Sequence, residues 1–105
     1  MWLFTSRSFV SIVVDKDNPG RRLVRARCKG DIEELFPDAD VFEDQTADYR
    51  YRTSVSTDEL IEKLTEYIED MDYANFKNSI PPNKKKYRNA CIGVWSLMLG
   101  LQKIG

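Results

Sequence analysis

The chain has 105 residues, a length typical of one domain, and its residues are 42% apolar and 31% charged. This is the composition of an ordinary globular protein, and it excludes a disordered or membrane-embedded chain. The net charge of −1 says little by itself about the kind of partner. We therefore expect one α+β domain over residues 1–105 in a soluble, cytoplasmic protein.

The small net charge hides a strong segregation of charge along the chain. Residues 31–72 carry 15 Asp or Glu and three Lys or Arg. Residues 1–30 carry seven basic and two acidic residues, and residues 73–105 carry six basic residues and no acidic one. A field divided in this way can steer partners of either sign to different faces. Alternatively, the acidic middle and the basic ends pair with one another across the surface.

The sequence carries no sign of export or of membrane insertion. The N-terminal apolar run breaks at residues 5–7 and lacks the basic and apolar regions of a signal peptide. The apolar segment at residues 92–105 is too short and too polar to span a bilayer, so no membrane association is expected. Cys28 and Cys91 cannot make a disulfide framework, which favours reduced thiols and a cytoplasmic location.

A β-hairpin is expected in the first part of the chain. Residues 9–14 are apolar and β-branched and predict a strand, which can extend back to Trp2 with an irregularity at residues 5–8. The DKDNPG segment at residues 15–20 has the residues of a turn. Residues 21–28 then form the partner strand.

Alternation divides the side chains of this second strand into two sets. Only the side that carries Val24, Ala26 and Cys28 can face a core. A short helix follows at residues 31–36, where Asp31 can act as the N-cap.

Two further strands are expected, a short one at residues 41–43 and a longer one at residues 47–55. In the longer strand, one side carries Tyr49, Tyr51, Thr53 and Val55, and the other carries Arg50, Arg52 and Ser54. A regular strand would therefore turn both tyrosines toward the core and both arginines toward solvent.

Two helices complete the expected fold. Residues 56–59 form a capping box, and apolar residues follow at helical spacing from Leu60 to Met71. A helix over residues 84–103 has one apolar stripe formed by Ala90, Cys91, Val94, Leu97, Met98 and Leu101. Its second apolar side carries Ile92, Trp95 and Leu99, which is more than one buried stripe needs.

This order of elements predicts an α+β domain in which a mostly antiparallel sheet carries helices on one face. A ferredoxin-like topology is the first expectation for the order of the strands.

Several segments together resemble a family of small bacterial proteins of about 100 residues to which no activity is assigned. They are MWLFT with FVSIV, VRAR with GDIEELFP, DYRYR, DYANFK, and VWSLM followed by LQ. The resemblance covers nearly the whole chain, although each segment alone is uninformative. It implies a compact single domain and brings no functional residue with it.

No catalytic or metal-binding motif is present in the sequence. Without histidine, the common Ser-His and Cys-His nucleophile pairs cannot form, and two distant thiols cannot build a zinc site alone. The scattered glycines form no phosphate-binding loop. Acidic residues between positions 38 and 48 could hold Mg²⁺ or Ca²⁺, but a solvated loop is the favoured interpretation. We expect no cofactor and no metal, and an enzyme is only the third interpretation.

Arginines on two predicted strands form the first candidate surface. If these strands share a sheet, its outer face can carry Arg21, Arg25, Arg27, Arg50 and Arg52. The guanidinium fork suits phosphate and carboxylate, and nearby aromatic rings would add stacking platforms for single-stranded nucleic acid. Further phosphate contacts could come from Lys84, Lys85 and Lys86. Alternatively, the arginines pair with the acidic helices or keep the protein soluble.

The second candidate surface is the second apolar side of the last helix. There Trp95, with Ile92 and Leu99, would make an aromatic anchor of the kind found in protein interfaces. Alternatively, Trp95 packs under the sheet or against Tyr73 and Phe76. We favour a non-enzymatic protein-interaction module, of an accessory or inhibitor-like kind, that binds a protein partner or self-associates. Nucleic-acid or phosphate binding through the arginine face is the alternative.

Overall fold

The computed structural model describes the backbone of residues 1–104 and the side chains of residues 1–102, a part of the chain that contains five strands and four helices. The strands are β1 (Trp2–Phe4), β2 (Phe9–Val14), β3 (Arg21–Ala26), β4 (Phe42–Glu43) and β5 (Tyr51–Ser56). The helices are α1 (Asp31–Leu35), α2 (Thr57–Glu69), α3 (Phe76–Ser79) and α4 (Lys85–Ile104).

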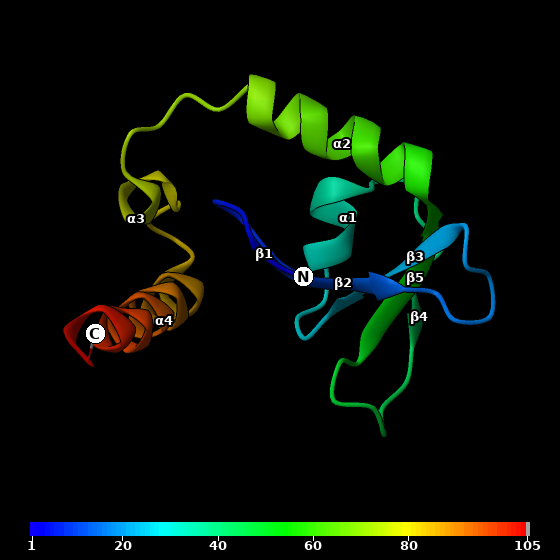
Figure 1. Ribbon diagram of the computed structural model, residues 1–105, viewed down its shortest axis with the longest axis horizontal. Coiled ribbons are helices and arrows are strands. Elements are labelled where there is room, and N and C mark those ends of the chain that lie inside the picture. Colours follow the sequence, from blue (N-terminus) through cyan, green and yellow to red (C-terminus); the bar gives the residue numbers. More distant parts are fainter. Residues whose placement is uncertain (105) are drawn as a thin grey trace.

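The strands form one antiparallel sheet with the spatial order β1-β2-β3-β5-β4. Helices α1 and α2 lie against one face of the sheet, whereas α3 and α4 lie beyond its β1 edge (Figure 1). The predicted α+β class, with helices on one face of an antiparallel sheet, is therefore confirmed. We call the opposite face of the sheet the outer face.

The irregularity predicted at residues 5–8 is a tight turn that separates β1 from β2. The backbone N–H of Thr5 donates to the carbonyl of Ser8 at 2.8 Å, and the Thr5 hydroxyl oxygen accepts from the Ser8 N–H at 2.9 Å. Both residues are buried. These hydrogen bonds between Thr5 and Ser8 close the turn, so Trp2–Phe4 forms a separate strand that pairs with β2.

The expected ferredoxin-like topology is wrong. That arrangement places a helix directly after the first strand, in the order strand-helix-strand-strand-helix-strand. Here three consecutive strands lie side by side before the first helix, and β5 rather than β4 pairs with β3.

The core lies between the sheet and helices α1 and α2. Its buried residues are Val10, Ile12, Val24, Ala26, Ile32, Leu35, Phe36, Val55 and Leu60. Burying each Val, Leu, Ile or Phe side chain in this core stabilises the folded state by about 1.5–3 kcal/mol. The predicted inward direction of Val24 and Ala26 is confirmed. Cys28 is exposed because β3 ends at Ala26, before the alternation reaches it.

Helix α1 begins differently from the prediction. Its N-cap is Gly30, whose φ of 94° lies in the left-handed region that favours glycine. Asp31 is buried, and its carboxylate accepts a hydrogen bond of 3.2 Å from the backbone N–H of Phe9. The carboxylate thus ties α1 to the start of β2 instead of capping its own helix. Sequence position alone could not distinguish these two roles.

Helix α2 begins as predicted, because the Ser56 hydroxyl accepts from the N–H of Glu59 at 3.1 Å. Its inner side packs on the core through Leu60, Leu64 and Tyr67. Ile61 and Ile68, which belong to the same predicted apolar pattern, are exposed. The helix therefore covers the sheet with a narrower stripe than the sequence indicates.

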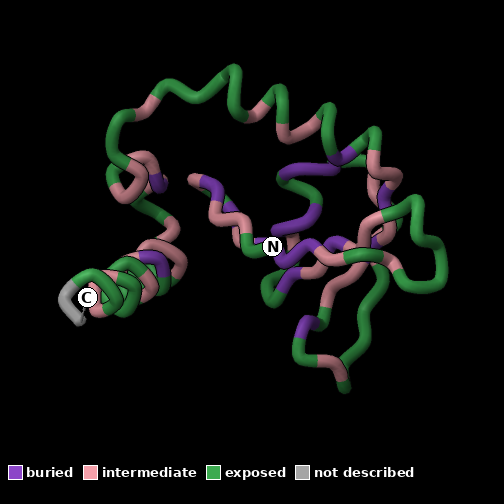
Figure 2. Tube along the Cα trace, viewed as in Figure 1, coloured by how far each residue is buried: buried purple, intermediate pink, exposed green. Residues whose placement is uncertain are grey.

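Helix α4 contacts the body of the protein mainly through its first turns. Cys91 is buried, whereas most of the helix after it is exposed or half-buried (Figure 2). The predicted stripe is thus covered only at its N-terminal end. None of the helices within the described residues is both long and apolar enough to cross a membrane.

Candidate functional site

The outer face of the sheet carries a row of polar and charged side chains across three strands. Strand register places Ser11 of β2 opposite Arg25 of β3, and Arg25 opposite Arg52 of β5. Arg25 donates to the Ser11 hydroxyl at 2.8 Å, and Arg52 donates to the backbone carbonyl of Tyr49 at 3.3 Å. The sequence-based placement of Arg25 and Arg52 on one face is therefore confirmed.

Tyr49 is buried on this outer face, and its predicted direction toward the core is wrong. The guanidinium carbons of Arg25 and Arg27 lie 4.5 and 4.6 Å from the centre of its ring. Strand β5 begins only at Tyr51, so the alternation that governs Tyr51 does not extend back to Tyr49. Tyr51 itself packs against the core as predicted.

The two arginines control the electrostatics around this tyrosine. Burial alone would raise the pKa of the Tyr49 hydroxyl, but interactions with Arg27 and Ser11 and the charges of Arg27 and Arg25 lower this pKa. The Nε of Arg25 is buried and has no hydrogen-bond partner among the described residues. Since a ring face attracts cations, Tyr49 holds two positive charges close together without a carboxylate between them.

Aromatic rings extend this surface toward the β1 edge. Register pairs Phe4 with Phe9 and Trp2 with Ser11, so both β1 aromatics share the outer face with β2. The rings of Phe4 and Phe9 are stacked with centroids 4.5 Å apart, and Trp2 meets Phe9 edge-on at 5.7 Å. Tyr49 follows at 6.5 Å from Phe9. We call Trp2, Phe4, Phe9 and Tyr49 the aromatic row.

A cleft of about 550 Å³ opens where the aromatic row meets the start of α4. We call it the cationic cleft, because six Lys or Arg residues and only one acidic residue, Asp31, line it. Its basic residues are Arg7, Arg27, Lys29, Lys84, Lys85 and Lys86. Its apolar surface includes Phe4, Phe9 and Ala90, beside the ring of Tyr87.

The walls of the cationic cleft are held together by specific hydrogen bonds. The Tyr87 hydroxyl lies 2.5 and 2.7 Å from the carbonyl oxygens of Thr5 and Ser8. Burial raises the pKa of this hydroxyl well above its ordinary value, so it stays protonated and remains a donor. The Lys84 ammonium donates to the carbonyl of Arg7 at 2.8 Å. The cleft is therefore formed before any ligand arrives.

The predicted site residues thus fall into three groups. The fold brings Arg27, Lys84, Lys85 and Lys86 together at the cationic cleft, with Arg25 and Arg52 on the adjoining sheet. Arg50 is exposed in the loop before β5, outside this surface. Arg21 lies at the far end of β3, where it donates to the Ser54 hydroxyl at 3.0 Å.

Sequence reasoning missed the contribution of the first strand and its turn. Trp2, Phe4 and Arg7 join the site because β1 is a separate strand beside β2. The alternation of aromatic residues at positions 2 and 4 was the available signal. It pointed to a strand with one aromatic side, and only the register shows which side that is.

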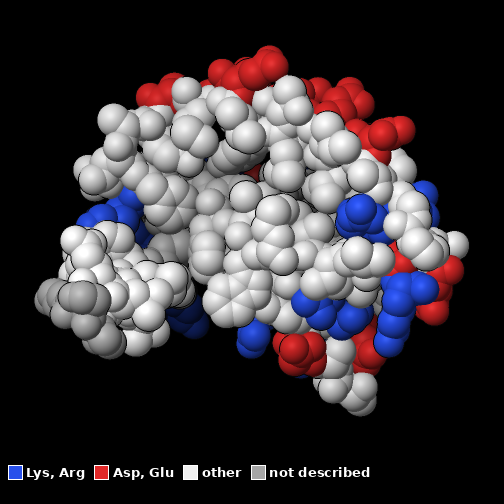
Figure 3. Space-filling view, in the orientation of Figure 1, with Lys and Arg blue, Asp and Glu red and all other residues white. Residues whose placement is uncertain are grey.

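Among the residues whose side chains the structure describes, no direct ion pair joins the acidic middle of the chain to its basic ends. Within the described residues, the one ion pair is Lys63–Glu66 in α2, at 3.4 Å. Figure 3 shows acidic side chains gathered over α2 at the top of the view, and Lys and Arg side chains lower on the molecule, where further acidic side chains lie among them at the lower right. The alternative of mutual pairing across the surface is therefore not supported, and the basic surface stays open to an anionic partner.

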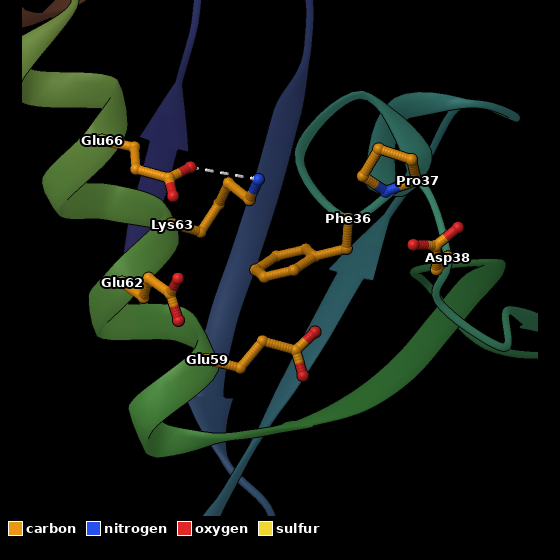
Figure 4. Close-up of a pocket in the computed structure, with 7 residues that line it drawn as sticks. All are labelled: Phe36, Pro37, Asp38, Glu59, Glu62, Lys63 and Glu66. Carbon is orange, nitrogen blue, oxygen red and sulfur yellow. Dashed lines mark hydrogen bonds and ion pairs between the residues drawn. The ribbon is translucent and has the colours of Figure 1, made fainter.

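An acidic groove of about 200 Å³ lies between α2 and the segment that follows α1. Figure 4 shows Glu59 and Asp38 on either side of Phe36, with Lys63 paired to Glu66. Among the described residues, no three Asp, Glu or Cys side chains come close enough to share a metal ion. The carboxylates of the groove come from Asp38, Glu59, Glu62 and Glu66.

The second predicted surface lies on α4 and is more exposed than the sequence indicates. Trp95 is 53% exposed, and the Lys77 ammonium lies 4.4 Å from the centre of its ring. The predicted interface partners Ile92 and Leu99 are half-buried. Leu97, Met98 and Leu101, expected on the buried stripe, are 79%, 58% and 65% exposed. Trp95 lies on the second apolar side of the helix and Leu97, Met98 and Leu101 on the first, and we call these four exposed side chains together the α4 apolar face.

No protein-family model, curated protein or solved structure matches this chain. The resemblance to a family of small bacterial proteins therefore stays a prediction. What the protein binds has to be argued from its own two surfaces, the α4 apolar face and the outer face with its cationic cleft.

Proposed function

We propose that the protein is a non-enzymatic protein-interaction module that binds through the α4 apolar face. The observation that carries this proposal is the exposure of four large apolar side chains on one 20-residue helix. Leu97, Met98 and Leu101 share one side of the helix, and a group of exposed apolar side chains marks an interaction site more often than scattered single residues do.

The energy available from this face supports binding. Fully burying one Leu or Met side chain contributes about 1.5–3 kcal/mol. Trp95 adds a large planar anchor, the residue type most enriched among interface hot spots. Lys77 holds the indole ring from one side by a cation–π contact, so the ring loses less conformational freedom on binding than a free tryptophan would.

The charges around this face favour a partner with an acidic rim. Residues 73–105 contain basic residues and no acidic one. Complementary charge speeds the encounter of two proteins and excludes wrong partners. The proposed partner is therefore a protein with an apolar groove and acidic surroundings, and self-association through the α4 apolar face is the other possibility that the test below covers.

The test uses two substitutions that should leave the fold intact, Leu97→Asp and Leu101→Asp, because both positions are largely exposed. Crosslinking in the cells that produce the protein should trap a partner with the wild type and not with the double variant. If the partner is a second copy, sedimentation velocity should show a dimer for the wild type and a monomer for the double variant. Ile61→Asp on α2 is the matched control, since Ile61 is an equally exposed apolar helix residue. Unchanged crosslinks and unchanged sedimentation in the double variant would overturn the proposal.

A second candidate function is the binding of a phosphate-bearing ligand at the outer face and cationic cleft. The observation that favours it is the gathering of six basic side chains at one preformed cleft. Arginine and lysine in such a group attract phosphate by charge and hydrogen bonds. Binding of labelled oligonucleotides that weakens steeply between about 50 and 200 mM salt would support it. Absence of binding at the lower salt would exclude it.

A further inference from the structure

We propose that the cationic cleft and the aromatic row bind single-stranded nucleic acid, with an unpaired base against Phe4 and Phe9 and phosphates on the basic rim. This inference rests on the second candidate function and goes further, because it requires bases as well as phosphates. It assigns roles to Trp2, Phe9 and Lys85, and it predicts which of these residues discriminates single strands from duplexes.

The shape and lining of the cleft fit one nucleotide unit. Its volume of about 550 Å³ falls within the range of about 300–1,000 Å³ typical of small-molecule sites. Flat apolar surface from Phe4, Phe9 and Ala90 lies beside ammonium groups of Lys85 and Lys86. A nucleotide has a planar base and a phosphate joined to it through the sugar. The base can therefore contact the apolar part of the lining while the phosphate contacts the lysines.

The charge of the cleft is free to act on a ligand. Its single carboxylate, on Asp31, is buried and already accepts the Phe9 N–H. Lys85 and Lys86 are exposed, and neither takes part in an ion pair within the described residues. Each phosphate that such a side chain neutralises releases counterions, which makes binding favourable at low salt.

The aromatic row continues the site from the cleft onto the sheet. Phe9 lines the cleft and also contacts Trp2 and Phe4, while Arg27 lines the cleft and covers Tyr49. A strand leaving the cleft would therefore meet the exposed ring of Trp2 on one side and the guanidinium planes of Arg27 and Arg25 on the other. Base stacking on an aromatic ring is worth about 1–3 kcal/mol and does not depend on sequence.

Single strands are favoured over duplexes because stacking needs a free base face. In a duplex the bases are stacked on one another, and a protein reaches mainly their edges and the phosphates. An acidic peptide would use the lysines but would leave the rings of Trp2 and Phe9 without planar partners. The combination of rings and cations on an uncovered antiparallel sheet therefore points to unpaired nucleotides.

The experiment measures fluorescence anisotropy of a labelled single strand of about 12 nucleotides and of the matching duplex, at about 50 and 200 mM salt. The wild-type protein should bind the single strand at least about 10-fold more tightly than the duplex. Trp2→Ala should weaken single-strand binding about 10-fold with little effect on the duplex. The double variant Lys85→Ala with Lys86→Ala should weaken binding of the single strand and of the duplex. It should also reduce the slope of log affinity against log salt concentration by the amount that about two phosphate contacts contribute.

Two matched controls accompany these variants. Lys16→Ala removes an exposed lysine in the turn after β2, and Leu97→Asp alters the α4 apolar face; neither should change nucleic-acid affinity. Equal binding of single strand and duplex, unaffected by Trp2→Ala, would overturn this inference and leave simple phosphate binding. Absence of binding to both oligonucleotides at the lower salt would overturn both this inference and the second candidate function.

Discussion

Helices α1 and α4 show opposite relations between length and burial. Helix α1 has five residues, yet Ile32 is completely buried and Leu35 nearly so. Helix α4 has twenty residues and a richer apolar pattern, yet between Trp95 and Gln102 its described side chains are exposed or half-buried (Figure 2). The difference teaches that an apolar helix pattern reports the capacity to be buried and not the presence of a partner.

Chain connections explain why the two helices differ. Helix α1 lies between β3 and the β4–β5 hairpin, so the chain must return to the sheet on both sides of it. Helix α4 comes last in the described chain and is joined to α2 by a connection that contains only the short α3. It is anchored near its first turn by Tyr87 and Lys84, and nothing pulls its later turns toward the sheet.

The largest expected effect comes from comparing Ile32→Ala with Leu97→Ala. Ile32→Ala should lower the free energy of unfolding by about 2–5 kcal/mol, because it leaves a cavity in the core. Leu97→Ala should change it by less than about 0.5 kcal/mol, because its side chain is mostly in water already. Urea denaturation of both variants measures the difference. A cost at Leu97 close to that at Ile32 would show that α4 is covered in solution, as in a dimer.

A smaller effect is expected at the anchor of α4. Tyr87→Phe removes the hydroxyl that lies between the Thr5 and Ser8 carbonyls, and should cost about 0.5–1.5 kcal/mol. Because the hydroxyl holds α4 to the β1–β2 turn, amide hydrogen exchange should become faster in α4 than in α1. Uniformly faster exchange in both helices would instead show that α4 is integrated with the core.

The smallest effect concerns pH and the carboxylate at the start of α1. Burial raises the pKa of Asp31, and Glu33 and Glu34 act in the same direction, while the Phe9 N–H and Lys84 oppose them. The unfolded chain therefore loses this proton at lower pH than the folded protein does. Stability from this group is full below the unfolded-state pKa and declines as pH rises toward the folded pKa.

Asp31→Asn should remove this decline, since the amide oxygen can still accept from the Phe9 N–H. Urea unfolding at about pH 3.5 and pH 7 should show the variant gaining stability relative to wild type at the higher pH. A relative loss at the higher pH would mean that the ionised carboxylate stabilises the fold. In that case the attraction between the Asp31 carboxylate and the Lys84 ammonium would outweigh the cost of burying the charged carboxylate.

Much of the local structure could be predicted from residue patterns. Alternation placed Val24, Ala26 and Tyr51 on the core side, and Ser56 was recognised as a helix cap. These features depend on neighbours two to four residues apart, so the sequence shows them directly. The expectation for Tyr49 failed because alternation holds only inside a strand, and the position where β5 begins is decided by pairing with β3.

The candidate site was predicted in pieces that the sequence could not join. Arg25, Arg27 and the lysine run were recognised as possible phosphate ligands, but the sequence did not indicate that Arg27 and Lys84–Lys86 line one cleft. Their meeting depends on contacts between residues about eighty positions apart, such as Tyr87 with Thr5. The same long-range packing leaves the α4 apolar face uncovered.

The sequence by itself determined the α+β class, the inner face of the sheet and the segregation of charge, because each follows from composition or short-range periodicity. Only the tertiary structure decided that β1 is a separate strand, that Tyr49 lies beside two arginines, and that Trp95, Leu97, Met98 and Leu101 of α4 are exposed. These features depend on which distant segments pack together, and packing is a property of the whole chain.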